Sequence, residues 1–302
     1  MGEVRVLVDG RSAPAGVPCG VPADDRGFAY GDGVFRTVRT DRGRPWLWAE
    51  HLAVLQRDCA RLGIPLGPEQ RRALCRDAAV LAGGEDGVLR VTVTRGSGPR
   101  GYRPPTDPRS RVVLSFLPGP PAPLPAAAVA VRLCRTPVAR SPATAGVKHL
   151  GRLEQVLARA EWDDPRWFEG LMEDGAGLLV CGTTSNLFLR RGPVLRTPAL
   201  DLAGVAGVVR ERLLGDDALR TAVGIETVET GCIAADELRG ADELFLTNAV
   251  LGVRAVARVD GHDRCLFEGA APGACAHALG ERFASELGRG SFELPGGTAP
   301  CA

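Results

Sequence analysis

A run of prolines near the middle of the chain limits what can be built across it. Residues 118–125 read Pro-Gly-Pro-Pro-Ala-Pro-Leu-Pro. Proline fixes its own φ and has no amide N–H, so this run is incompatible with a helix or a central strand. The run therefore predicts a linker, which separates an N-terminal domain at residues 1–117 from a C-terminal domain at residues 126–287.

Strand and helix patterns are mixed on both sides of this linker. Short β-rich segments are expected at 4–8, 34–39, 88–94, 112–117, 129–133, 178–190 and 243–247, and helical spacing at 49–62, 69–82, 150–162, 208–214 and 271–287. Because hairpin-like strands are interspersed with helices, we predict an α+β fold with two α+β domains. The Gly- and Pro-rich segment 288–302 is predicted to be a disordered tail.

Charge and hydropathy narrow the class of protein. The 302 residues carry a net charge of +1 without a basic run, so neither nucleic acid nor an anionic membrane is expected as a partner. No apolar run approaches the roughly 18 residues of a membrane-spanning helix, and the N-terminus lacks a signal pattern. Nine scattered cysteines without a C-x-x-C pair argue against a disulfide framework or a zinc site. We therefore predict a cytoplasmic protein that acts on a small molecule.

Lysine occurs once in the chain, at Lys148, whereas 36 of the 37 lysines and arginines are arginine. Arginine stays protonated at neutral pH and cannot serve as an amine nucleophile or base. A single lysine in such a composition indicates a position where a deprotonatable amine is needed. The alternative is a surface lysine in a chain with an arginine bias.

Four segments of the chain, in order, resemble the class IV aminotransferases, which are fold-type IV enzymes that use pyridoxal 5'-phosphate (PLP). They are 25–35 (Asp-Arg-Gly-Phe-Ala-Tyr-Gly-Asp-Gly-Val-Phe), 87–102, 145–157 and 182–188, the last followed by 197–198 and 204–207. The second and third segments are most similar to the aminodeoxychorismate lyases of the family. The resemblance implies an N-terminal α+β domain, a C-terminal domain with a barrel-like sheet, PLP between the two, and a homodimer.

The resemblance also assigns the residues that would hold the cofactor. Lys148 falls on the lysine that forms a Schiff base with PLP, an amine that the substrate displaces and that then moves a proton. The turn 204–207 falls where the family binds the cofactor phosphate, which implies contacts from the backbone of Val208 and Val209. A helix that starts after such a turn favours an anion through its free N–H groups and its dipole.

Further residues are assigned to the substrate. Thr37 matches a hydroxyl that assists the lyase reaction in the family, and Tyr30 matches an active-site tyrosine. Arg90, Arg95 and Arg100 are candidates to bind the two carboxylates of the substrate, because a planar guanidinium binds a carboxylate in bidentate fashion.

Two positions depart from the family. Its helix pattern His-x-x-Arg-Leu carries an arginine that binds the cofactor phosphate, and here Val54 stands at that position. The family also places a glutamate, the partner of the protonated pyridine nitrogen, five residues before the asparagine of the fourth segment. Here that position is Cys181, and a thiol is a weak partner for such a proton.

These departures leave several hypotheses open. The first is a lyase that eliminates pyruvate from 4-amino-4-deoxychorismate to give 4-aminobenzoate, with PLP retained. The second is a cofactor-independent enzyme on the same fold, which has lost PLP and uses Lys148 directly. A D-amino-acid or branched-chain transaminase and a non-catalytic binding protein are the remaining alternatives.

Overall fold

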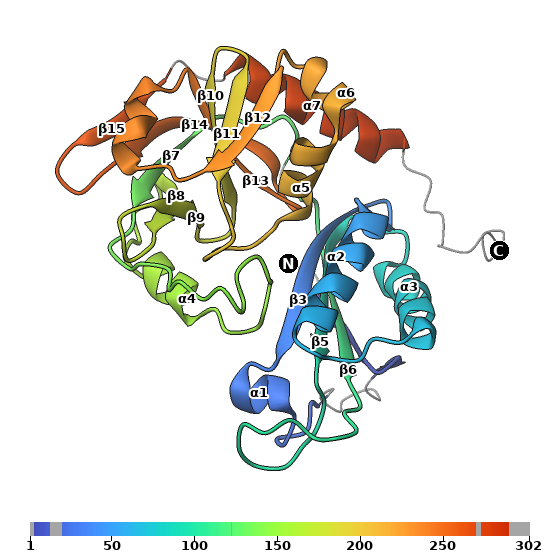
Figure 1. The fold of residues 1–302 in the computed structure, drawn as a ribbon. Helices are drawn as coiled ribbons and strands as arrows, with labels where there is room; N and C mark the ends of the chain where they lie inside the picture. Colours follow the sequence, from blue (N-terminus) through green and yellow to red (C-terminus); the bar gives the residue numbers. More distant parts are fainter. Residues whose placement is uncertain (1–2, 13–19, 122, 270–272, 290–302) are drawn as a thin grey trace. The chain divides into compact units, whose positions relative to one another are not determined.

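The structure is a computed structural model that describes residues 3–12, 20–121, 123–269 and 273–289 (Figure 1). It contains two compact units, and each is described here by itself. Unit 1 contains the described residues up to Pro121, the segment Lys148–Gly151 and the end of the last helix. Unit 2 contains residues 123–147 and the described residues of Arg152–Glu286. Most of the predicted tail, 288–302, lies outside the described residues.

Unit 1 is built on a six-stranded sheet in the order β2-β1-β6-β5-β3-β4. All of its strand pairs are antiparallel. The strands are β1 (Arg5–Val8), β2 (Arg11–Ser12), β3 (Gly33–Asp41), β4 (Arg44–Pro45), β5 (Gly87–Thr94) and β6 (Arg111–Pro118). The four longer strands coincide with the segments predicted at 4–8, 34–39, 88–94 and 112–117.

Two helices cover one face of this sheet, and a third lies before β3. They are α1 (Arg26–Tyr30), α2 (Trp48–Arg61) and α3 (Pro68–Ala82); α2 packs against β3 and α3 against β6, β5 and β1 (Figure 1). Side chains alternate along a strand, and Val34 and Val38 of β3 are fully buried. Phe35 and Thr37, at the intervening positions, therefore lie on the opposite face of the sheet.

Unit 2 is built on a nine-stranded sheet. Its strands are β7 (Val129–Leu133), β8 (Trp167–Glu173), β9 (Leu179–Gly182), β10 (Asn186–Arg191), β11 (Val194–Pro198), β12 (Thr227–Gly231), β13 (Glu243–Asn248), β14 (Gly252–Asp260) and β15 (Cys265–Glu268). The order is β12-β11-β10-β13-β14-β7-β8-β9, with β15 paired to β14. Strand β9 at one end also contacts β10, so the sheet curls back on itself. The predicted α+β class is confirmed.

The helices of unit 2 are α4 (Leu153–Arg159), α5 (Val208–Gly215), α6 (Asp217–Thr221), a 3-10 helix (Ala235–Gly240) and α7 (Ala274–Arg289), the last as far as Glu286. The core contains Leu171, Leu187 and Leu246, each at most 1% exposed. Within the described ranges, no helix combines the length and the hydrophobicity needed to cross a membrane.

One short segment departs from the predicted domain division. Residues 148–151 fall inside the predicted C-terminal domain, 126–287, but pack with unit 1. The reason is backbone pairing with β3: Leu150 N–H donates to Gly33 O over 2.9 Å, and His149 forms an antiparallel bridge with Val34. This pairing also explains why α4 begins at Leu153 rather than near residue 150.

Candidate active site

The backbone of Lys148 is fixed on both sides of its side chain. Its N–H donates to Asp58 Oδ2 over 3.1 Å, and its carbonyl oxygen accepts from Phe35 N–H over 2.9 Å. Asp58 comes from α2 and is 1% exposed. Strand β3 and helix α2 therefore hold the lysine peptide together.

The amine of Lys148 lies beside an aromatic ring that it shares with an arginine. Its Nζ is 4.5 Å from the centroid of the Phe35 ring, and Arg90 Cζ is 4.0 Å from the same centroid. Both distances suit a cation–π interaction. Thr37 lies two residues from Phe35 on the same face of β3 and is the cross-strand partner of Arg90. The structure thus brings three of the predicted residues, Lys148, Thr37 and Arg90, to one face of the unit 1 sheet.

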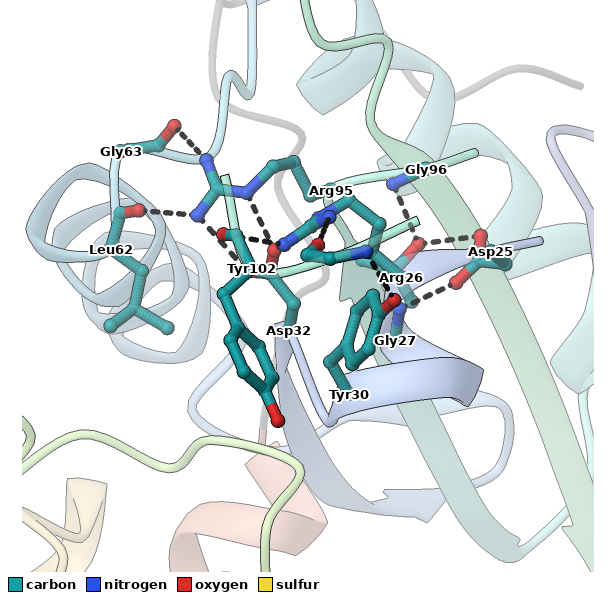
Figure 2. A network of polar contacts seen from close by, with 12 residues as sticks. Asp25, Arg26, Gly27, Tyr30, Asp32, Leu62, Gly63, Arg95, Gly96 and Tyr102 are labelled. Carbon is teal, nitrogen blue, oxygen red and sulfur yellow. Dashed lines mark hydrogen bonds and ion pairs between the residues drawn. The ribbon is translucent and has the colours of Figure 1, made fainter. Parts of the chain in front are cut away.

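Arg95 lies elsewhere, in a network of internal contacts (Figure 2). Its Nε and Nη2 donate to the two oxygens of Asp32, and its Nη1 and Nη2 donate to the carbonyls of Gly63 and Leu62. The side chain is 8% exposed. These contacts give Arg95 a structural role, tying the end of β5 to the residues after α2.

Tyr30 lies in the same part of unit 1 (Figure 2). Its hydroxyl accepts from Gly101 N–H over 2.8 Å, and its ring meets that of Tyr102 edge to face with centroids 5.6 Å apart. Arg26 donates to the carbonyls of both Gly101 and Tyr102. Tyr30 therefore helps to hold the loop after β5 against α1. Arg100, in that loop, is exposed.

The turn before α5 is held by backbone hydrogen bonds to Gly146, two residues before Lys148. Gly146 N–H donates to Gly204 O over 3.0 Å, and Ala206 N–H donates to Gly146 O over 2.9 Å. Gly204 has a φ of +86°, and a Cβ there would lie within 2.8 Å of Val180 and Leu200. Glycine is needed at this position because both the backbone conformation and the space exclude a side chain.

Helix α5 begins after this turn without a capping side chain. Its N-cap is Gly207, which makes no side-chain hydrogen bond to the first turn. Asn186 Nδ2 donates to Val205 O over 2.8 Å, and a Cβ on Gly207 would lie 2.3 Å from Asn186 Oδ1. The first N–H groups of a helix have no acceptor within the helix, so the N–H groups of Val208 and Val209 are placed to meet an anion.

Cys181 lies in an apolar cluster of unit 2. It pairs with Met172 across β8 and β9 and is 7% exposed. Burial raises the pKa of Cys134, in the same cluster, to about 12, so this environment disfavours a negative charge. The next residue, Gly182, faces the other side, where a Cβ would lie 3.0 Å from Glu169. Glu169 is thus on the wrong face of the sheet to replace the glutamate expected at position 181.

Sequence reasoning missed Glu169, which is 3% exposed. Its carboxylate accepts from the hydroxyls of Thr183, Thr184 and Ser185, and from three backbone N–H groups including those of Thr183 and Thr184. These contacts fix the turn that leads to Asn186. An isolated acidic residue between apolar ones was the available signal, but all of its partners except Gly170 lie 14 to 16 residues further along the chain.

The residues described fit PLP at two of three positions. The amine of Lys148 suits an aldehyde, and the turn before α5 suits a phosphate. At the third position Cys181 offers no carboxylate to a protonated pyridine nitrogen.

The chain is also similar to known proteins. The sequence profile of the family described as amino-transferase class IV matches residues 33–259. An aminodeoxychorismate lyase of Vibrio harveyi is 32% identical over 241 residues, which are 79% of this chain and 87% of that protein.

Two solved structures are also similar. The 4-amino-4-deoxychorismate lyase of Pseudomonas aeruginosa has a TM-score of 0.80 and 39% identity, and the match covers 93% of this chain and 99% of that one. A branched-chain aminotransferase of Thermoproteus uzoniensis, with norvaline, has a TM-score of 0.78 and 21% identity, with 95% of each chain covered. The second likeness concerns the fold alone.

The Asp32 network generates a prediction about stability. Burial opposes the ionisation of Asp32, but hydrogen bonds from Arg95 and Arg26 outweigh it and hold the pKa of the carboxyl below its ordinary value. Such a group stabilises the fold above its unfolded-state pKa, and the contribution is lost as the pH falls through the folded-state pKa. Asp32→Asn should therefore lower the free energy of unfolding at pH 7 by roughly 3 kcal/mol, and the deficit should narrow below about pH 4.

Urea unfolding at several pH values measures this deficit. The control is Asp236→Asn, which removes an exposed ion pair with Arg264 and should change the free energy of unfolding by less than about 1 kcal/mol. Equal effects of the two substitutions at pH 7 would contradict the structural role given to Asp32.

Proposed function

Because the chain belongs to the class IV aminotransferase family, we propose that it is a lyase that converts 4-amino-4-deoxychorismate into 4-aminobenzoate and pyruvate. The observation that carries this proposal is the grouping of Lys148, Thr37 and Arg90 on one face of the unit 1 sheet. A base, a hydroxyl and a carboxylate-binding cation are the groups that such an elimination needs.

We propose PLP as the cofactor, as is general in this family. When bound, it supplies an aldehyde that holds the amine of the substrate and a ring that withdraws electrons. The Gly204–Gly207 turn, with the N–H groups of Val208 and Val209, would bind its phosphate. Lys148 would hold the cofactor through its amine, and its fixed backbone limits where that amine can reach.

The chemical step follows from the roles of these side chains. Lys148, as a neutral amine, removes the proton from the ring carbon that bears the substrate amine. The bond between the ring and the ether oxygen then breaks, the ring becomes aromatic, and Thr37 assists the departing enolpyruvate through its hydroxyl. Protonation of the methylene carbon of enolpyruvate gives pyruvate. Arg90 orients the substrate by binding a carboxylate. Arg100 is a second candidate for this role, whereas the donors of Arg95 are engaged with Asp32 and two carbonyls.

Cys181 favours elimination over amino transfer. Without a carboxylate partner, the pyridine nitrogen keeps its proton less readily, and the bound ring withdraws electrons less strongly. An elimination that forms an aromatic ring is driven by its product and tolerates this loss better than transamination does. The cofactor-independent alternative is not favoured, since the anion-binding turn before α5 is retained.

The first prediction from the proposed function concerns Lys148. Borohydride reduction in the presence of PLP should add the mass of the cofactor to the peptide that carries Lys148, the sole lysine. Lys148→Ala and Lys148→Arg should both fold and lose activity by roughly 10²–10⁴-fold, the usual contribution of a positioned acid or base. The arginine variant is the matched control, because it keeps the charge and removes the basic amine. Wild-type turnover in either variant would refute the mechanism.

The second prediction concerns the type of reaction. An assay coupled to pyruvate reduction should detect pyruvate release from 4-amino-4-deoxychorismate, with little amino transfer to 2-oxo acids. Cys181→Glu should raise amino transfer in the presence of PLP, because a carboxylate would stabilise the protonated ring nitrogen. Cys181→Ser, of similar size and without charge, should not. Robust transamination without pyruvate in the wild type would overturn the assignment as a lyase.

A further inference from the structure

A buried arginine on β3 makes little use of its donors. Arg36 lies between Val34 and Val38 on the face of the sheet covered by α2, and it is 2% exposed. It forms an ion pair with Asp58 through Nη2. Among the described residues Asp58 is its one hydrogen-bond acceptor, and Nε has none. A guanidinium has five N–H groups, so most of its capacity is unused.

His51 is a second buried group with unused capacity. It is 3% exposed, and neither ring nitrogen has a hydrogen-bond partner in the part of the chain that the structure describes. Burial and the charges of Arg36 and Lys148 lower its pKa to about 3. The ring is therefore neutral at physiological pH, and one of its nitrogens carries a hydrogen that can be donated.

Buried polar groups are normally hydrogen-bonded, so unused donors indicate an acceptor that binds there. The charge of the cluster formed by Arg36, His51 and Asp58 indicates which kind of acceptor would bind there. Arg36 is a cation, and its partner Asp58 also accepts the backbone N–H of Lys148. Arg57, next in sequence, lies 3.7 Å from the other oxygen of Asp58. A guanidinium with unused N–H donors beside a neutral imidazole that can also donate suits an oxyanion.

The cluster lies beside Val54, which stands where the family has its phosphate-binding arginine. His51, Val54 and Asp58 are spaced by three and four residues, and all three are buried on one face of α2. Arg36 bonds to Asp58 and lies near enough to His51 to lower its pKa. Its guanidinium therefore meets the stripe of α2 in which Val54 replaces the phosphate-binding arginine of the family.

We propose that Arg36, assisted by His51, binds an oxygen of the cofactor phosphate and supplies from β3 the cation that Val54 does not supply from α2. This inference rests on the proposed function insofar as it takes PLP to be the cofactor. A substrate carboxylate has the same chemistry. The phosphate is favoured because Arg36 pairs with Asp58 on the stripe of α2 where the family carries its phosphate-binding arginine.

Comparing PLP with pyridoxal, which lacks the phosphate, tests this inference. Arg36→Met alone would leave Asp58 buried without its partner, so it is combined with Asp58→Asn, which keeps an oxygen to accept Lys148 N–H. In the double variant the dissociation constant for PLP, measured by absorbance titration, should rise by roughly 10- to 100-fold. That for pyridoxal should be unchanged. Asp58→Asn alone is the matched control and should retain the preference for PLP.

A rescue variant separates phosphate binding from a general loss of structure. Adding Val54→Arg to the double variant places a guanidinium on the same stripe of α2. It should restore at least part of the preference for PLP, whereas Val54→Met, of similar length and without charge, should not. Circular dichroism and urea unfolding establish that each variant is folded.

The outcomes distinguish this inference from the proposed function. If the folded double variant keeps the wild-type ratio of PLP to pyridoxal affinity, Arg36 does not bind the phosphate. If that ratio is kept but the KM for 4-amino-4-deoxychorismate rises, the cluster binds a substrate carboxylate instead, which also overturns the inference. If wild-type protein releases pyruvate yet binds PLP no more tightly than pyridoxal, the inference fails and the assignment as a lyase stands.

Discussion

The buried carboxylate of Asp58 joins the parts of unit 1 on which Lys148 depends. It is carried by α2, pairs with Arg36 of β3 and accepts the backbone N–H of Lys148. A carboxylate with 1% exposure is stable only when its oxygens are paired and hydrogen-bonded. The helix, the strand and the lysine segment are thus held in one arrangement, because separating α2 from β3 would leave a buried charge unpaired and moving the lysine segment would remove a hydrogen bond from that charge.

The two faces of β3 carry different residues of the candidate site. Positions 34, 36 and 38 face α2 and anchor the strand, whereas Phe35 and Thr37 face the other way, where the Lys148 amine and Arg90 lie. Side chains alternate strictly along a strand, so a shift of one residue in register would exchange the two sets. Eight consecutive pairs with β5 fix this register. The proposed chemistry therefore depends on sheet pairing as much as on the identity of each side chain.

The regular spacing of apolar residues allowed much of the fold to be predicted from the sequence. Two strands with buried charged residues were missed, because the polar partners of those residues lie far away in the sequence. The α+β class, α2, α3 and the long strands of unit 1 follow from spacing alone. Strands β8 and β14 were not predicted, because Glu169 and Arg254 interrupt their apolar patterns. Glu169 is tolerated in β8 because hydroxyls and N–H groups from 183–185 surround it. No local pattern in the sequence reveals such partners.

Only part of the candidate site could likewise be predicted from the sequence. The family motifs and the sole lysine identified Lys148, but they could not separate Arg95 from Arg90. Both are arginines on or beside β5, and only the positions of Asp32 and two carbonyls show that Arg95 is engaged. Arg36 carried a signal that was not used, since a charged residue alternating with Val34 and Val38 must find a partner inside.

The chain departs from the family at Val54, which stands in place of an arginine, and at Cys181, which stands in place of a glutamate. The surrounding structure offers a substitute for the first lost side chain but not for the second. Val54 lies in a stripe of α2 that Arg36 approaches from the facing strand, so a cation can be supplied from another element. Cys181 lies in an apolar cluster, and Glu169, although close in the sheet, points to the opposite face. In the proposed site the phosphate therefore keeps a cationic partner, whereas a protonated pyridine nitrogen has no carboxylate partner. Such a site suits an elimination driven by its aromatic product better than a transfer of amino groups, which depends on the ring itself.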